Sequence, residues 1–204
     1  GQQGGSVLRY LYENGTFQVK AMVRDVNSDK AKIILEKYPK VTLIVGDLND
    51  TDSLSKAMEG CYGVFGVTNF WDPSVGYEGE IRQGKNIGDA CKIANVQHLV
   101  FSTLDGGTGV AHLESKSIAE NYIRSIGVPM TALYTSAYYE NVNTFFAPKE
   151  ADGKLVFSVA QKVTTKVPMY SVNDTGGWVV QVFLNPQFIN KSVAAITEYL
   201  TYDE

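Results

Sequence analysis

The alternation of strand-like and helix-like segments over residues 1–134 constrains the fold of this chain more than any other feature. After an opening helix that ends at Asn14-Gly15, apolar runs of strand length alternate with segments of helical period, and short connections join them. The predicted strands cover residues 17–23, 41–45, 63–67, 98–101 and 130–134, and the predicted helices that follow the first cover residues 28–35, 51–58, 78–94 and 112–126. Continuous apolar strands separated by helices predict a parallel sheet covered by helices on both faces.

The alternation stops after Tyr134. Proline and glycine divide the rest of the chain into short segments, with one more helix expected near residues 172–184. We therefore expect an α/β protein with a doubly wound parallel sheet over residues 1–134. Residues 135–204 are expected to supply edge elements and a small, partial C-terminal lobe that binds a substrate or partner and does not fold independently.

Composition excludes several classes of protein. The chain has 204 residues, 44% of them hydrophobic, and a net charge of −4, which suits one folded core and argues against disorder or a broad nucleic-acid interface. No apolar run approaches the ~18 residues of a membrane span, and no signal peptide is evident at the N-terminus. Cys61 and Cys91 match no disulfide framework or zinc pattern. We expect a soluble, cytoplasmic protein without metal, membrane or nucleic-acid binding.

A glycine cluster and an arginine suggest a dinucleotide site. Gly1-Gln2-Gln3-Gly4 precedes a helix, and in a doubly wound sheet such a loop lets a pyrophosphate rest on the helix N-terminus; the alternative is a flexible chain end. Arg24 follows Gly4 by 20 residues and ends the strand predicted at 17–23, where the adenosine ribose would lie. Arginine there favours a 2′-phosphate, and hence NADP over NAD, unless it pairs with its neighbour Asp25.

Polar residues follow the next predicted strands as well. Asp47 either meets the adenine edge or caps a turn. Thr68 and Asn69 end the strand at 63–67, on the sheet edge where ligands bind in open α/β folds, although both are common turn residues. Arg82, on the helix that follows, could reach a phosphate or remain a surface cation.

His112 and Lys116 lie one helical turn apart, just after Ser102-Thr103 at the end of a predicted strand. Lys116 could hydrogen-bond the hydroxyls of a nicotinamide ribose; the alternative is a solvated helix face. The chain has no phosphate-loop lysine, nucleophile elbow or zinc-binding histidine pair.

Taken together, these residues resemble the NmrA-like proteins, an atypical branch of the short-chain dehydrogenase/reductase superfamily, and are most similar to its redox sensors. The resemblance covers nearly the whole chain, and the Thr-Asn-aromatic-Trp and aromatic-Glu-Asn stretches make it specific. The segments that carry it are residues 1–7, 23–24, 46–47, 67–71, 83–85, the His112/Lys116 pair, 127–131 and 138–141.

The resemblance implies a Rossmann fold that binds NADP(H). Gly1 to Gly4 would contact the pyrophosphate, Arg24 the 2′-phosphate and Lys116 the ribose. The other implied cofactor contacts are Asp47 and Leu48 near adenine, Thr68, Asn69 and Phe70 along the cofactor, and Tyr138, Tyr139, Glu140 and Asn141 around the nicotinamide.

The resemblance also implies regulation rather than catalysis. His112 stands where catalytic relatives have the tyrosine of a Tyr-x-x-x-Lys pair, and a neutral imidazole is a poorer proton donor near pH 7. The expected protein therefore senses NADP(H) and binds partner proteins, transcription factors included, in the cytoplasm and also the nucleus; a homodimer is compatible. One alternative is an NAD(P)H-dependent reductase of quinones or small carbonyls that uses Lys116, His112 or Tyr138.

The family fingerprint has a strand and one more glycine upstream of Gly1. A central parallel strand satisfies the backbone groups of its two neighbours, so we expect the natural protein to carry this first strand and the present chain to lack it. A chain that truly lacks the strand would fit a third function, a cofactor-free protein-binding scaffold.

Overall fold

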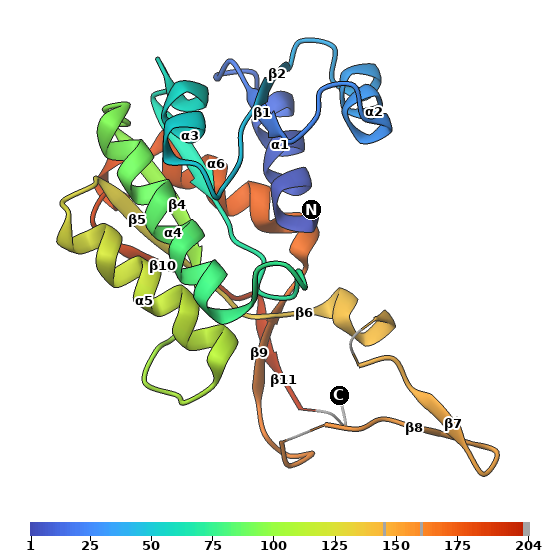
Figure 1. Ribbon diagram of the computed structural model, residues 1–204. Helices are drawn as coiled ribbons and strands as arrows, with labels where there is room; N and C mark the ends of the chain where they lie inside the picture. The colour runs from blue at the N-terminus through green and yellow to red at the C-terminus, as the bar shows by residue number, and fades with distance from the viewer. Residues whose placement is uncertain (145, 160, 202–204) are drawn as a thin grey trace.

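Parallel strands sandwiched between helices form most of the protein (Figure 1). The computed structural model describes residues 1–144, 146–159 and 161–201. The alternating part contains α1 (Gln2–Asn14), β1 (Lys20–Val23), α2 (Asp29–Lys37), β2 (Thr42–Val45), α3 (Thr51–Met58), β3 (Gly63–Gly66), α4 (Gly76–Ile93), β4 (His98–Thr103), α5 (Ala111–Ser125) and β5 (Met130–Thr135). After β5 come β6 (Ala137–Tyr138), η1 (Tyr139–Asn143), β7 (Lys149–Ala151), β8 (Lys154–Val156), β9 (Val167–Tyr170), η2 (Val172–Asp174), α6 (Thr175–Leu184), η3 (Pro186–Phe188), β10 (Ser192–Ala195) and β11 (Glu198–Leu200).

The main sheet has the strand order β10-β5-β4-β3, and all of its strands run parallel. Alternate residues of β4 face opposite layers. Leu99 and Phe101 pack with side chains of α3, α4 and α5, whereas Val100 packs with side chains of α1 and α6. Every residue of β4 is buried. The predicted doubly wound α/β fold with a parallel sheet is confirmed.

The strands β1 and β2 form a separate parallel pair. In the described part of the chain, no strand pairing joins β1 to β3. A cavity of about 1250 Å³ is lined by residues of β1, β3 and α1. The strand expected ahead of Gly1 stays a prediction.

Most predicted boundaries agree with the structure. The helix predicted at 51–58 is α3, Ser28 caps α2 by accepting from the Ala31 amide, and Gly15 ends α1 in the left-handed conformation at φ 74°. One strand differs: β1 starts at Lys20 rather than at residue 17. Its partner β2 begins opposite Lys20, and the ring of Phe17 packs instead on Phe183, with 6.0 Å between ring centroids.

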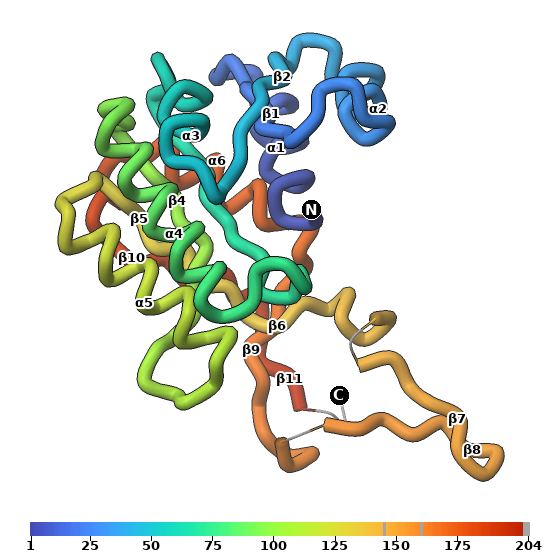
Figure 2. Tube along the Cα trace, viewed as in Figure 1, coloured from blue at the N-terminus to red at the C-terminus, as the bar shows by residue number. Residues whose placement is uncertain are grey.

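Residues after Tyr134 contribute both to the core and to a projecting part. Helix α6 packs closely on α1, since the Gly176 amide donates to Ser6 Oγ at 2.9 Å, and β10 extends the main sheet beyond β5. A small sheet, β11-β9-β6, lies next to this core, and the β7–β8 hairpin extends away from it (Figure 2). Within the described ranges, no helix has the length and apolar character needed to cross a membrane.

His98 at the start of β4 is completely buried. The Thr131 hydroxyl donates to Phe188 O at 2.7 Å, so its oxygen accepts from His98 Nε2, which also lies 2.7 Å away. The ring is therefore the neutral Nε2–H tautomer, and no partner is described for its Nδ1. Burial lowers the pKa of His98 to about 4.

This burial predicts that stability is lost in mild acid. Below its ordinary pKa of 6.5, His98 takes up a proton in the unfolded chain, whereas in the folded protein it does so only near pH 4. The free energy of unfolding should therefore fall by about 1.4 kcal/mol per pH unit across that window, and not above it. Urea denaturation measures the slope in the wild type and in His98→Gln, and the slope of the variant should be smaller by this contribution. Identical slopes would contradict the assignment.

Close packing of α4 on α5 gives a second prediction. A Cβ on Gly84 would overlap the Cβ of Ala119, and one on Gly88 would lie 2.7 Å from Ile123 Cγ1. We expect Gly84→Ala to destabilise the protein by about 1–3 kcal/mol. The control is Gly5→Ala, where the new Cβ meets nothing within 4 Å and helix propensity should add about 0.5–1 kcal/mol. Chemical denaturation checks both; stabilisation by both changes would show that α4 and α5 can separate at no cost.

Candidate functional site

The carboxyl ends of the parallel strands place the candidate site at one edge of the sheets, where α1 also begins (Figure 1). The site residues come from the segments that follow β1, β2, β3 and β4, from the first turn of α1, and from α4 and α5. Residues separated by more than a hundred positions in the sequence therefore meet here. Ligands of open α/β sheets bind at this edge.

The N-terminus of α1 is open. Gly1, its N-cap residue, provides no side-chain cap, and the first turn contains no acidic residue. The first backbone bond of the helix runs from the Gly5 amide to Gly1 O at 2.9 Å, so the amides of the preceding turn have no acceptor within the helix. A Cβ added at Gly4 or Gly5 would meet nothing within 4 Å. This helix end can therefore receive an anion at close approach.

Gln3 links α1 to the segment after β5. Its Nε2 donates to Tyr138 Oη at 2.7 Å, and the Tyr138 ring packs edge-on against Tyr170 with centroids 5.4 Å apart. Gln3 Oε1 and Ser102 Oγ are buried without a described hydrogen-bond partner.

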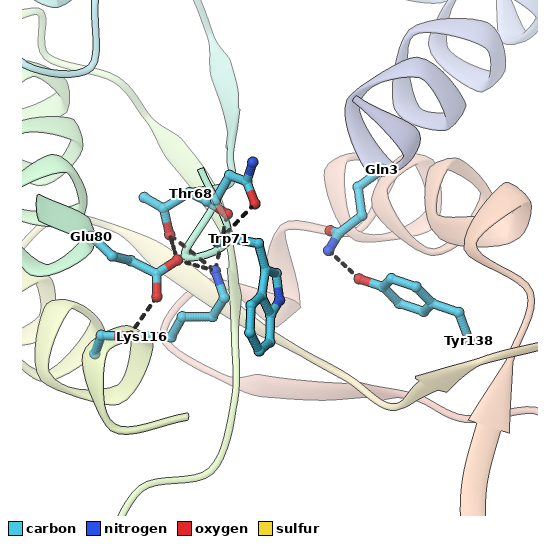
Figure 3. A network of polar contacts seen from close by, with 8 residues as sticks. Gln3, Thr68, Trp71, Glu80, Lys116 and Tyr138 are labelled. Atoms are coloured by element: carbon cyan, nitrogen blue, oxygen red, sulfur yellow. Dashed lines mark hydrogen bonds and ion pairs between the residues drawn. The ribbon is translucent and has the colours of Figure 1, made fainter. Parts of the chain in front are cut away.

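Lys116 lies in a buried polar network (Figure 3). Its Nζ donates to Glu80 Oε1 at 2.7 Å, to Thr68 O at 3.0 Å and to Thr68 Oγ1 at 3.0 Å. Burial lowers the pKa of Lys116, and the Glu80 carboxylate opposes that shift. Because an ammonium has three donors, a ribose hydroxyl would bind Lys116 Nζ only by replacing one of these three contacts.

Glu80 is the site residue that sequence reasoning missed. Its side chain is completely buried at the start of α4, where Oε1 also accepts from Thr68 Oγ1 at 2.8 Å and Oε2 accepts from Ser115 Oγ at 2.5 Å. A signal did exist: Glu80, Gly84, Ile87 and Cys91 share the buried face of α4. An acid on the buried face of a helix requires a partner.

His112 does not join Lys116. The ring centroid of His112 lies 5.9 Å from that of Phe70 and 5.2 Å from that of Trp71, and these two rings contact each other at 5.1 Å. The predicted His112/Lys116 pair therefore separates into an aromatic cluster and a charged network. Asn69 turns the chain between them, since its Oδ1 accepts from the Trp71 amide at 3.2 Å.

The residues after β2 mainly form turns. Asp47 Oδ1 accepts from the backbone and side-chain nitrogens of Asn49 at 2.9 and 3.0 Å, so the structure shows its turn-forming role. Leu48 O accepts from Asn86 Nδ2 at 2.8 Å, which ties this loop to α4. Contact of Asp47 or Leu48 with adenine stays a prediction.

Two residues predicted around the nicotinamide, Tyr139 and Glu140, form hydrogen bonds with β11 and with the turn at η2. Tyr139 Oη donates to Glu198 Oε1 at 2.5 Å, and this bond raises the pKa of Tyr139 to about 12. Glu140 accepts from Ser171 Oγ at 2.6 Å, from the Val172 amide at 3.1 Å and from Asn173 Nδ2 at 3.0 Å. The backbone carbonyl of the next residue, Asn141, accepts from the Thr144 amide.

The two arginines predicted at the site, Arg24 and Arg82, are exposed. Arg24 directly follows β1, and its charge contributes to the lowered pKa of Asp72, which results mainly from hydrogen bonds of Ser74. Arg24 is therefore close enough to the loop after β3 to act on it electrostatically. Arg82 lies on the outer face of α4. Among the residues that the structure describes, no cluster of histidine, cysteine and carboxylate side chains could hold a metal ion.

Comparison with known proteins agrees with this architecture. The model of the NmrA-like family matches residues 1–204. The chain is 29% identical to the NmrA-like family domain-containing oxidoreductase FrzB of Cladobotryum sp, covering 100% of this chain and 68% of the relative.

Two solved structures are also similar. NmrA, a negative transcriptional regulator, is 27% identical with a TM-score of 0.82, over 100% of this chain and 66% of NmrA. NmrA in complex with NADP is 26% identical with a TM-score of 0.81, over 99% and 65%. The chain thus spans about two thirds of the length of the relatives that it matches.

Proposed function

This chain belongs to the NmrA-like family, and from that premise we propose that it is an NADP(H)-binding regulatory protein. Its binding to partner proteins would change with the cofactor that it holds, in the cytoplasm or nucleus, and the partner could be a transcription factor or a second copy of the chain. The observation that carries the proposal is the open, glycine-rich N-terminus of α1 at the carboxyl edge of the sheet. A similar protein, NmrA, has been solved with NADP.

The residues present fit a dinucleotide. Free space over Gly4 and Gly5 admits a pyrophosphate to the amides of α1. Arg24, directly after β1, suits a 2′-phosphate. When bound, NADP(H) would supply a hydride donor or acceptor.

The site itself favours sensing over turnover. His112 packs against Phe70 and Trp71, so it does not stand beside Lys116 as a proton donor. Tyr138 accepts a hydrogen bond from Gln3, which links the first turn of α1 directly to β6. A ligand that binds α1 would therefore act, through Gln3 and Tyr138, on β6, which leads into the β11-β9-β6 sheet and the β7–β8 hairpin.

A cofactor titration tests the proposal. Arg24→Ala should weaken NADP(H) binding by at least about tenfold, because it removes the cation opposite the 2′-phosphate, and should change NAD(H) binding little. Isothermal titration calorimetry with all four nucleotides measures this. Lys154→Ala, which removes an exposed charge on the β7–β8 hairpin, is the control. Equal losses for both cofactors would refute the role of Arg24, and no binding by the wild type would favour the scaffold function.

A reductase is the second candidate. Relatives such as FrzB are described as oxidoreductases, and Lys116 is a charged group at the sheet edge where a nicotinamide would lie. Quinones or small carbonyls would be the substrates, and Lys116 or Tyr138 would assist proton transfer.

Turnover separates the two candidates. If the protein is a regulator, NADPH oxidation with a panel of quinones and aldehydes should stay far below ~1 s⁻¹, which is the lower end of ordinary enzyme rates. The absorbance of NADPH at its long-wavelength band follows the reaction. Faster turnover that disappears in Lys116→Ala would establish the reductase instead.

A further inference from the structure

The pair formed by Glu80 and Lys116 is too deeply buried to be incidental. The Glu80 side chain is 0% exposed and the Lys116 side chain 12% exposed. Removing a carboxylate or an ammonium from water costs several kcal/mol unless partners replace the water. A surface ion pair would have small effects, whereas here each charge depends on the other.

The hydrogen bonds define the charge of each group. Glu80 accepts from three donors, which are Lys116 Nζ, Thr68 Oγ1 and Ser115 Oγ. The Thr68 hydroxyl gives its one proton to Glu80 and therefore receives one from Lys116. An ionised carboxylate and a protonated amine satisfy every member of this chain of donors.

Glu80 is also the charged group that acts on Lys116 from its surroundings. The end of β3 offers only the neutral carbonyl and hydroxyl of Thr68. On α5 itself, His112 is turned toward Phe70 and Trp71, and Ser115 binds the far oxygen of Glu80. Without Glu80, burial would act on Lys116 unopposed.

We propose that Glu80 is the positioning residue of Lys116: it keeps the buried ammonium charged and holds it against Thr68 in the segment that follows β3. The two residues act as one unit, and α4 takes part in the site through its first turn. The inference rests on the proposed function only in taking NADP(H) as the ligand that meets Lys116.

The ion pair determines how Glu80→Gln should change the pKa of Lys116 and the affinity for NADP(H). The substitution keeps the shape of the side chain and removes its charge, so the pKa of Lys116 should fall further below its ordinary value. An amine is charged only below its pKa, so the variant loses the ammonium as the pH rises. Its affinity for NADP(H) should therefore decrease toward alkaline pH, over a range in which the wild type is constant.

The first experiment follows Lys116 directly by NMR of protein carrying ¹³C at lysine Cε, with Lys116→Met to assign the resonance. In the wild type, Lys116 should still be charged at about pH 7.5 in spite of its burial, a test that needs no variant at Glu80. In Glu80→Gln the titration should move to lower pH. Ser115→Ala, which disturbs the same carboxylate but leaves its charge, should titrate like the wild type. A neutral Lys116 in the wild type, or no shift in Glu80→Gln, would overturn the proposal.

The second experiment is a double-mutant cycle on NADP⁺ affinity by calorimetry. Glu80→Gln alone should bind at least about fivefold more weakly at alkaline pH. Adding it to Lys116→Met should change the affinity less than twofold, because Glu80 acts through Lys116. If Glu80→Gln lowers NADP⁺ affinity by the same factor in the wild type and in Lys116→Met, Glu80 acts independently of Lys116 and the proposal is overturned. If the wild type binds no NADP⁺, the proposed function fails, while the NMR titration still decides the role of Glu80.

Discussion

Helix α4 approaches α5 more closely than ordinary side chains allow, and much of the remaining structure follows from that approach. Gly84 and Gly88 leave space for Ala119 and Ile123, so the two helices pack against the same face of β4 around Phe101. One turn toward the N-terminus of each helix, the same short separation brings Glu80 to Ser115 and Lys116. The charged network is therefore an extension of the helix packing, and its geometry is as fixed as the core.

The second constraint is the parallel direction of the strands. Since β3, β4 and β5 run the same way, their carboxyl ends collect backbone groups and polar side chains at one edge. Several of these side chains are used to shape loops: Asp47 and Asn69 bind amides close to them in sequence, and Glu140 binds the turn of η2. The first turn of α1, in contrast, has no side-chain cap and no acidic residue.

Local patterns predicted local structure well. Helical periodicity and capping residues predicted α3, the end of α1 at Gly15 and the start of α2 at Ser28. These features depend on residues that are close in the sequence. Glu80 was missed because its partners Thr68 and Ser115 lie 12 and 35 residues away, and only the folded chain brings them together. The same reason applies to Tyr139 and Glu140, whose partners come from β11 and η2. The separation of His112 from Lys116 likewise depends on the Phe70 and Trp71 rings, which no helix spacing reveals.

The buried pair also changes the expected electrostatics of the cleft. From the sequence, Lys116 and Arg24 both count as cations that face an anionic ligand. In the structure Glu80 balances Lys116 at 2.7 Å, so the net charge of that part of the site is close to zero. The positive end of α1 and the exposed Arg24 then remain as the positive features of the site. Under the proposed function the helix end would meet the pyrophosphate that NAD and NADP share, so discrimination between the two would fall on Arg24.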